Sequence, residues 1–171
     1  MNSKERREYI TNLLLKNSNT YKGQFLAEEL GVTRQVIVKD IAITRAEGIN
    51  IIATPEGYLI PNEENDYARR VIAVSHSKED IYDELECIVK FGGVVEDVTV
   101  EHSLYGEIRA MLMIKTIVDI ENLKKRFKEF NAEPLSSLTK GVHLHTIKAE
   151  NEEIIESIIK ELKDKNYLIC D

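Results

Sequence analysis

The stretch YKGQFLAEELGVTRQVIVKDIAITRAEG, residues 21–48, constrains the fold of this chain more than any other segment. Its apolar residues have helical spacing on both sides of Gly31, a residue type that commonly ends a helix in the left-handed conformation. Thr33 is placed to cap a second helix that runs to about Glu47 and stops at Gly48. A short helix, a glycine turn and a capped helix predict a helix-turn-helix.

Two flanking segments complete the outline of a small DNA-binding domain. Residues 4–16 carry Ile10, Leu13 and Leu14 at helical spacing, which predicts an additional helix ahead of the helix-turn-helix. After the capped helix, INIIATPEGYLIP indicates two short strands around a turn at 55–57, a hairpin suited to be a wing. We therefore predict a winged helix-turn-helix domain at residues 1–62 that binds double-stranded operator DNA.

The capped helix presents small and polar side chains on the side opposite its apolar residues. In a major groove, Gln can read adenine, Arg can read guanine, and Lys can neutralise phosphate. A solvated helix face would carry the same residue types. The prediction of DNA binding therefore depends on the combination of this face with the turn and the wing. The residues predicted to contact DNA are Thr33, Arg34, Gln35, Lys39 and Arg45.

The overall charge of −7 does not argue against DNA binding, because it is unevenly distributed. Residues 1–61 hold eight Lys/Arg against seven Asp/Glu, and the remainder holds 15 against 23. No apolar run approaches the roughly 20 residues needed to cross a bilayer, and the charged N-terminus lacks the apolar region of a signal peptide. Cys87 and Cys170 form no metal-ligand spacing. These features predict a soluble cytoplasmic protein with no membrane partner.

Beyond a polar linker, PNEEND at 61–66, strands and helices alternate. Their order, β-α-β-β-α-β followed by a further helix, predicts an α+β, ferredoxin-like regulatory domain at residues 66–171. The closing YLICD is expected to add a short strand. The expected strands are 70–76, 94–102, 107–116 and about 141–149, and the expected helices are 78–91, 119–131 and 151–165.

Three histidines and one glutamate of this domain stand at unusual positions. His143 and His145, in KGVHLHTIKAE, point to one face of a strand, and His76 closes an earlier strand. Glu84 falls within the apolar stripe of its helix, where a carboxylate is unfavourable unless it is paired or binds a cation. The set suits a first-row divalent ion (nickel, zinc, manganese or iron), whereas Ca²⁺ and Mg²⁺ prefer oxygen ligands. The alternative is a buried Glu–His pair with two surface histidines.

His102 ends a strand in phase with Val98 and Val100, and we expect it to line the core or a ligand pocket. A catalytic interpretation would make Glu84 a base beside metal-bound water. The sequence has no paired nucleophile, no Gly-rich phosphate loop and no HExxH, so we favour a regulator that is not an enzyme. A metal-dependent enzyme with an autoregulatory DNA-binding domain and a purely metal-sensing repressor remain alternatives.

Three motifs, VTRQVIVKDIAITRAEGINIIATPEGYLI, VEHSLYGEI and LTKGVHLHTI, closely resemble the 3H-domain transcriptional repressors. The resemblance covers essentially the whole chain. It implies a homodimeric, nicotinic acid-responsive repressor of NAD biosynthesis and niacin uptake genes, with nicotinic acid as co-repressor near a nickel or zinc ion. The implied metal ligands are His76, Glu84, His143 and His145. Thr44 departs from the pattern, since a larger aliphatic residue is expected there.

Overall fold

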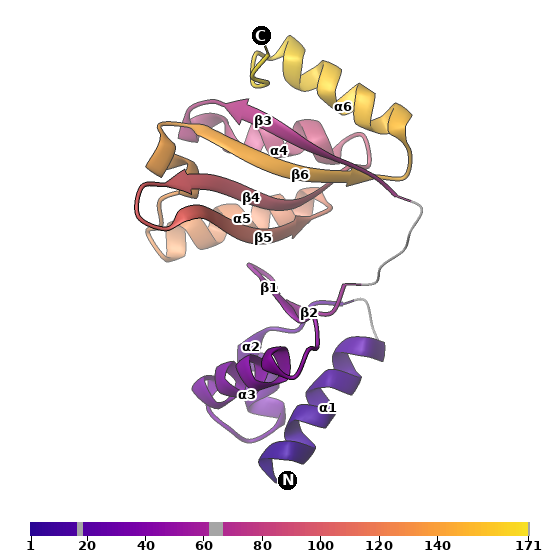
Figure 1. Cartoon of the computed structure of the whole chain (residues 1–171), viewed down its shortest axis with the longest axis vertical. Coiled ribbons are helices and arrows are strands. Elements are labelled where there is room, and N and C mark those ends of the chain that lie inside the picture. Colours follow the sequence, from indigo (N-terminus) through magenta and orange to yellow (C-terminus); the bar gives the residue numbers. More distant parts are fainter. Residues whose placement is uncertain (17–18, 62–66, 171) are drawn as a thin grey trace. The chain divides into compact units, whose positions relative to one another are not determined.

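The computed structural model describes residues 1–16, 19–61 and 67–170, which form two compact units, Met1–Glu63 and Glu64–Asp171 (Figure 1). Apart from Pro61, the predicted linker at 61–66 lies outside the described residues, as do the predicted domain limits at 62 and 66. Within those ranges, no helix combines the length and the apolar character needed to span a membrane.

The N-terminal unit has the predicted winged helix-turn-helix arrangement. Gly31 has φ of 63°, the left-handed conformation that lets the chain turn sharply between α2 and α3. The Thr33 hydroxyl accepts the N–H of Val36 at 3.4 Å and so caps α3 as expected. The elements are α1 (Ser3–Lys16), α2 (Gly23–Glu29), α3 (Arg34–Ala46) and the hairpin of β1 (Ile52–Thr54) and β2 (Gly57–Leu59).

Thr44 is accommodated in α3 by a local hydrogen bond. Its hydroxyl donates to the Asp40 carbonyl at 2.9 Å, so the polar atom is satisfied although the residue is only 3% exposed. The Asp40 side chain itself accepts from Arg6 of α1, which joins the two helices by a buried ion pair. The apolar core of this unit comprises Ile10, Leu14, Leu26, Ala27, Ile37, Ile41 and Ile51.

The C-terminal unit follows the predicted order β-α-β-β-α-β with a further helix. Short 3₁₀ turns, η1 (Lys78–Asp80) and η2 (Leu135–Thr139), precede α4 and β6. The predicted last strand is reduced to one antiparallel bridge between Leu168 and Val74. The elements are β3 (Ala68–Ser75), α4 (Ile81–Val89), β4 (Val94–His102), β5 (Gly106–Ile114), α5 (Ile117–Glu129), β6 (Val142–Ala149) and α6 (Glu152–Asp164).

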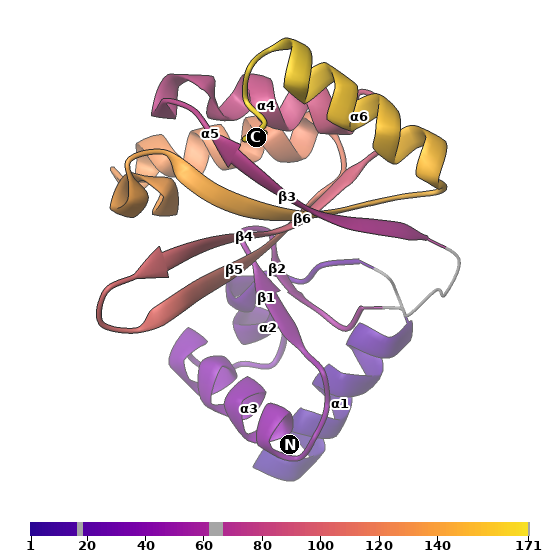
Figure 2. The same cartoon turned by 45° about the horizontal axis from the view of Figure 1, so that its top comes forward.

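The four strands form an antiparallel sheet in the order β3-β6-β4-β5, and the three helices cover one of its faces (Figure 2). The α+β class and the element order are as predicted, but the strand order differs from a ferredoxin-like sheet, in which the last strand lies at an edge. Here β6 lies between β3 and β4. The turn at Gly141 directs it there, since that glycine packs against the backbone of His76 at the end of β3.

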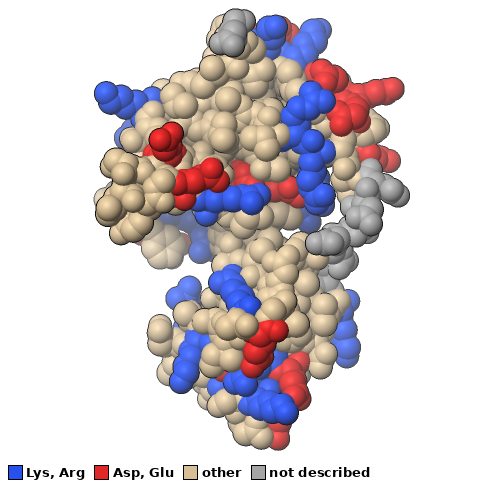
Figure 3. All heavy atoms as spheres, in the orientation of Figure 1, with Lys and Arg blue, Asp and Glu red and all other residues tan. Residues whose placement is uncertain are grey.

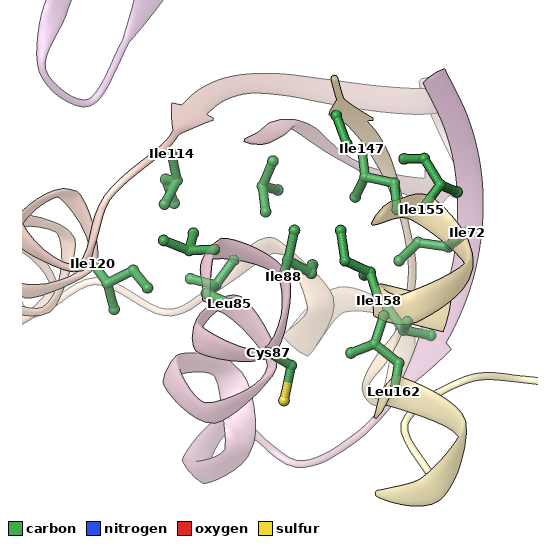
Figure 4. Packing of buried hydrophobic residues seen from close by; sticks show 14 residues of the cluster. Ile72, Leu85, Cys87, Ile88, Ile114, Ile120, Ile147, Ile155, Ile158 and Leu162 are labelled. Carbon is green, nitrogen blue, oxygen red and sulfur yellow. The ribbon is translucent and has the colours of Figure 1, made fainter. Parts of the chain in front are cut away.

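Between the helices and the sheet lies a single cluster of aliphatic side chains, seen closely in Figure 4. Ile72 of β3 and Ile147 of β6 meet Leu85 and Ile88 of α4 in this layer. Each large aliphatic side chain removed from water contributes roughly 1.5–3 kcal/mol. The core therefore fixes the faces that α4 and β6 turn toward each other, and Glu84 and the β6 histidines lie on these faces.

Candidate functional site

Glu84 belongs to the first turn of α4 and is completely buried. It precedes Leu85 and Ile88, which pack into the aliphatic core, so the helix phase that buries them also turns Glu84 inward. A buried ionised carboxylate carries a large desolvation penalty that only hydrogen bonds or positive charge can offset. What surrounds Glu84 therefore determines the chemistry of this region.

The structure brings the three predicted histidines to Glu84. Nε2 of His76 lies 2.7 Å from Oε2 of Glu84, and Nε2 of His143 lies 3.5 Å from the same oxygen. Nε2 of His145 lies 3.3 Å from Oε1, the other carboxylate oxygen. His143 and His145 are 4% and 3% exposed, so the alternative that they are surface residues is wrong. Register explains the convergence: Val74 pairs with His143 and Ile72 with His145.

Each imidazole is oriented by a backbone carbonyl on its other nitrogen. Nδ1 of His76 is 2.8 Å from the Ser77 carbonyl, and Nδ1 of His143 is 2.8 Å from the Gly141 carbonyl. Nδ1 of His145 is 2.5 Å from the Asp97 carbonyl. A carbonyl oxygen only accepts, so all three Nδ1 atoms must donate. In a neutral ring, the Nε2 atom that faces Glu84 therefore carries a lone pair and no hydrogen.

This arrangement is incomplete without a cation. Neutral Nε2 atoms and carboxylate oxygens are both acceptors, so they cannot bond directly to one another. Consistently, Oε1 of Glu84 is buried and accepts no hydrogen bond from any residue that the structure describes. Bonds of 2.0–2.1 Å around a tetrahedral ion separate its ligands by roughly 3.4 Å, close to the 3.3 and 3.5 Å separations at His145 and His143. The 2.7 Å separation at His76 is shorter and has the length of a direct hydrogen bond from a protonated ring. The residues present fit a divalent transition-metal ion.

Within the described chain, one group of possible ligands is His76, Glu84 and His143, whose ligand atoms all lie within 4.8 Å of one another. His145 joins the group through its 3.3 Å approach to Oε1 of Glu84. Imidazole suits zinc, copper, iron and nickel, and orientation of each ring by a carbonyl is typical of metal-binding histidines. The donor set is therefore compatible with a metal ion, and the assignment of all four residues as ligands, with His145 outside the group of three, remains a prediction.

Electrostatics also favours positive charge at the cluster. Burial raises the pKa of Glu84, but the charge of His145 and hydrogen bonding by protonated imidazoles hold that pKa well below its usual value. Burial lowers the pKa of His145 and of His76, and the Glu84 carboxylate more than offsets this, so both pKa values are raised. The carboxylate remains ionised, and protons or a metal ion compete for the space beside it.

Asp97 is a supporting residue that the sequence analysis did not identify. It lies at a bulge of β4, where pairing with both neighbouring strands shifts register. Its carbonyl orients His145, one carboxylate oxygen accepts the Thr146 N–H at 2.9 Å, and the other accepts Nε of Arg109 at 2.7 Å. The only sequence signal is an Asp next to Glu96, which breaks the alternation of VVEDVTVEH.

His102 is placed apart from the cluster, at the β4–β5 hairpin. Its Nδ1 accepts the N–H groups of Leu104 and Tyr105 at 3.1 and 3.3 Å, and its ring lies beside that of Tyr105. These contacts shape the turn. No effector role follows from this geometry, so the ligand-pocket assignment of His102 remains a prediction.

On α3, the predicted DNA contacts fall into two groups. Arg34, Gln35 and Lys39 are exposed near the beginning and middle of the helix, whereas Arg45 donates from Nε to the Ile51 carbonyl at 2.6 Å. Arg45 thus holds the segment leading to the wing. Over the N-terminal unit, the face in Figure 3 shows basic residues interspersed with acidic ones rather than one basic field.

Comparison with known proteins agrees with this architecture. A 3H domain family model matches residues 69–171, and an HTH domain model matches residues 6–59. The chain is 44% identical over 165 residues to the probable transcription repressor NiaR of Thermotoga maritima, covering 96% of this chain and 94% of that protein. It is 36% identical over 169 residues to the transcription repressor NadR of Bacillus subtilis, covering 97% and 94%.

A winged helix-turn-helix followed by a separate α+β unit defines the class, a DNA-binding transcription regulator. Within this class the chain belongs to the 3H-domain transcription repressors, because both the family model and two near full-length relatives match it. This membership confirms the family resemblance and the prediction that the protein is not an enzyme. This membership does not identify the metal, the effector or the oligomeric state.

Proposed function

We propose that the protein is a nicotinic acid-responsive repressor of NAD biosynthesis and niacin uptake genes. In this proposal a divalent metal, nickel or zinc, is held by His76, Glu84, His143 and His145 in the C-terminal unit. Nicotinic acid is the co-repressor, and a homodimer presents two winged helix-turn-helix units to operator DNA. The names of the relatives, probable transcription repressor NiaR and transcription repressor NadR, support the repressor part of this assignment.

One observation carries the metal part of the proposal. Three imidazoles donate through Nδ1 to backbone carbonyls and turn their Nε2 atoms to a single buried carboxylate. When bound, the ion supplies a Lewis-acid centre able to accept a carboxylate oxygen or a pyridine nitrogen. The protein residues supply orientation, since the carbonyls fix the rings and the core around Leu85 fixes Glu84.

The DNA part of the proposal rests on the helix-turn-helix. Gln35 and Lys39 are exposed on α3, so a base contact from the first and a phosphate contact from the second are sterically open. Co-repression requires that the effector and the operator tighten each other's binding by the same factor. This reciprocity makes the proposal testable from either side.

The experiment combines metal analysis with operator titration of the purified full chain. We expect about one metal ion per chain and an operator affinity that rises only when metal and nicotinate are both present. An affinity that responds to metal alone would instead identify a purely metal-sensing repressor. An affinity unchanged by saturating nicotinate with metal present would rule out the co-repressor mechanism.

A further inference from the structure

Two cavities each have one of the predicted metal ligands in their lining, His76 in one and His143 in the other. The first, here called the lysine cavity, measures about 290 Å³ and includes His76, Lys78, Glu133, Ser136, Ser137 and Lys140 in its lining. The second, the glutamate cavity, measures about 520 Å³ and includes Glu101, Glu107, Val142, His143 and Leu144. Either volume would hold a small aromatic ligand, so charge must decide between them.

The two cavities have opposite charge. The lysine cavity has two ammonium groups against the single carboxylate of Glu133. The glutamate cavity has two carboxylates and no Lys or Arg among its described lining residues. An anionic ligand is therefore repelled from the second cavity and attracted to the first.

The ion pair between Lys78 and Glu133 at the lysine cavity is easily displaced. Nζ of Lys78 lies 3.6 Å from Oε1 of Glu133, and the two side chains are 59% and 67% exposed. Exposed pairs of this kind contribute little to stability, typically less than about 1 kcal/mol. A ligand carboxylate can therefore replace Glu133 as the partner of Lys78 with only a small loss of stability.

Lys140 is held at the cavity by an unusual backbone. It has φ of 53°, a left-handed conformation that residues other than glycine rarely adopt. Gly141 follows with φ of 98°, and a Cβ there would come within 2.4 Å of the His76 carbonyl oxygen. Because the turn is packed directly on His76, the position of Lys140 is coupled to a predicted metal ligand.

Ser136 adds a hydrogen-bond donor to the same wall. The residue is only 6% exposed, and it belongs to the lining of the lysine cavity. Its carbonyl accepts the Gly141 N–H at 2.8 Å. A serine hydroxyl in the lining of a cavity can donate a hydrogen bond to a ligand oxygen.

We propose that the lysine cavity binds the carboxylate of the effector through Lys78, Lys140 and the Ser136 hydroxyl. This inference rests on the proposed function and makes it more specific, because it assigns the effector carboxylate to the two lysines. It also predicts selectivity. An aromatic monocarboxylate such as nicotinate binds more tightly than its neutral amide, because the amide gains nothing from the two ammonium groups.

The test is calorimetric titration of the nickel-loaded full chain with nicotinate and, separately, with nicotinamide. The variant is Lys78→Gln/Lys140→Gln, and the control is Lys160→Gln, which removes an exposed charge from α6. The double variant is expected to bind nicotinate about tenfold more weakly. Its affinity for nicotinamide should change less than about twofold, and the control should match the wild type.

Metal content and far-UV circular dichroism verify that the double variant is loaded and folded. If the nicotinate affinity of this variant stays within about twofold of wild type, the lysine cavity is not the carboxylate site, and the proposed function remains intact. Tighter nicotinate binding by Glu107→Gln, with no effect of the lysines, would move the site to the glutamate cavity. A nickel-loaded wild type that binds neither compound would overturn the proposed function together with this inference.

Discussion

Asp40 in the N-terminal unit and Glu84 in the C-terminal unit are both buried carboxylates among basic groups, and they are completed in different ways. Asp40 in the N-terminal unit is 2% exposed and accepts Nε of Arg6 at 2.5 Å and Nη2 at 3.2 Å. Glu84 in the C-terminal unit is 0% exposed and faces three imidazoles whose Nδ1 hydrogen atoms are donated to backbone carbonyls. One carboxylate has a charged fork matched to it, and the other has none.

The difference distinguishes a structural ion pair at Asp40 from a predicted metal site at Glu84. A guanidinium is permanently charged and presents two donors to one carboxylate, so the Arg6–Asp40 pair needs nothing further. Neutral imidazoles supply lone pairs to the Glu84 region, and one oxygen there has no donor among the described residues. A buried carboxylate surrounded by acceptors therefore indicates an ion binding site, whereas a buried carboxylate on a guanidinium indicates helix packing.

Removing two imidazoles should have the largest effect. His143→Ala/His145→Ala deletes two of the four predicted ligands, so we expect metal affinity to fall by more than about a thousandfold and the ion to be absent from purified protein. Plasma emission analysis of metal per chain measures this. His102→Ala is the matched control, because it removes a histidine at the hairpin and should leave metal content unchanged. Full metal retention in the double variant would eliminate this site.

Replacing each buried carboxylate by its amide should show most clearly how the two units differ in stability. Asp40→Asn leaves the Arg6 guanidinium buried without a counter-charge and should lower the free energy of unfolding by about 3 kcal/mol. Glu84→Gln should leave the metal-free protein within about 1 kcal/mol of wild type, because an amide N–H can donate to a bare Nε2. Both are read from urea unfolding in the presence of a chelator.

The metal content of these amide variants gives the converse result. Glu84→Gln should lose the ion, and Asp40→Asn should keep it. If Glu84→Gln destabilised the metal-free protein as strongly as Asp40→Asn, Glu84 would be a structural partner of the histidines, and the contrast between the units would disappear.

Sequence periodicity predicted Glu84 and the histidines for a physical reason. A carboxylate in phase with Leu85 and Ile88 conflicts with burial, and this conflict is visible in a single helix. The Arg6–Asp40 pair gives no such signal, because its members are 34 residues apart on two helices. Helix caps such as Thr33 and stops such as Gly31 were predicted correctly, since they are set by residues within one turn.

The strand order and the role of Asp97 depended on tertiary structure. Alternation assigns a face to each residue of β6, but it does not choose the neighbouring strands. The close packing of Gly141 on His76 places β6 beside β3, and the bulge at Asp97 then brings a carbonyl to His145. A bulge is one extra residue in one strand, which a run of valines and acids does not specify.

Asp97 tests whether the support of the cluster extends beyond its ligands. Asp97→Ala removes the acceptor of the Thr146 N–H and of Arg109, so the bulge that presents its carbonyl to His145 should loosen. We expect metal affinity to fall about 10- to 100-fold, measured by competition with a chelator. Asp97→Asn keeps an oxygen for Thr146 and should lose less. Equal and complete loss in both variants would indicate unfolding, which circular dichroism would reveal.

Replacing Lys39 should have the smallest effect on binding. Lys39 is a third electrostatic case, because it is an exposed cation on α3 that forms no ion pair within the described ranges. If it neutralises one phosphate, Lys39→Ala should weaken operator binding several-fold and reduce the slope of log Kd against log salt concentration by about 0.9. Filter binding at four salt concentrations measures the slope.

Lys4→Ala on α1, also exposed, serves as the control and should leave the slope unchanged. Metal content should be unaffected in both, because neither lysine is near the Glu84 cluster in sequence or belongs to its unit. An unchanged slope for Lys39→Ala would remove this residue from the DNA interface and leave Arg34, Gln35 and Arg45 as the exposed candidates on the same helix.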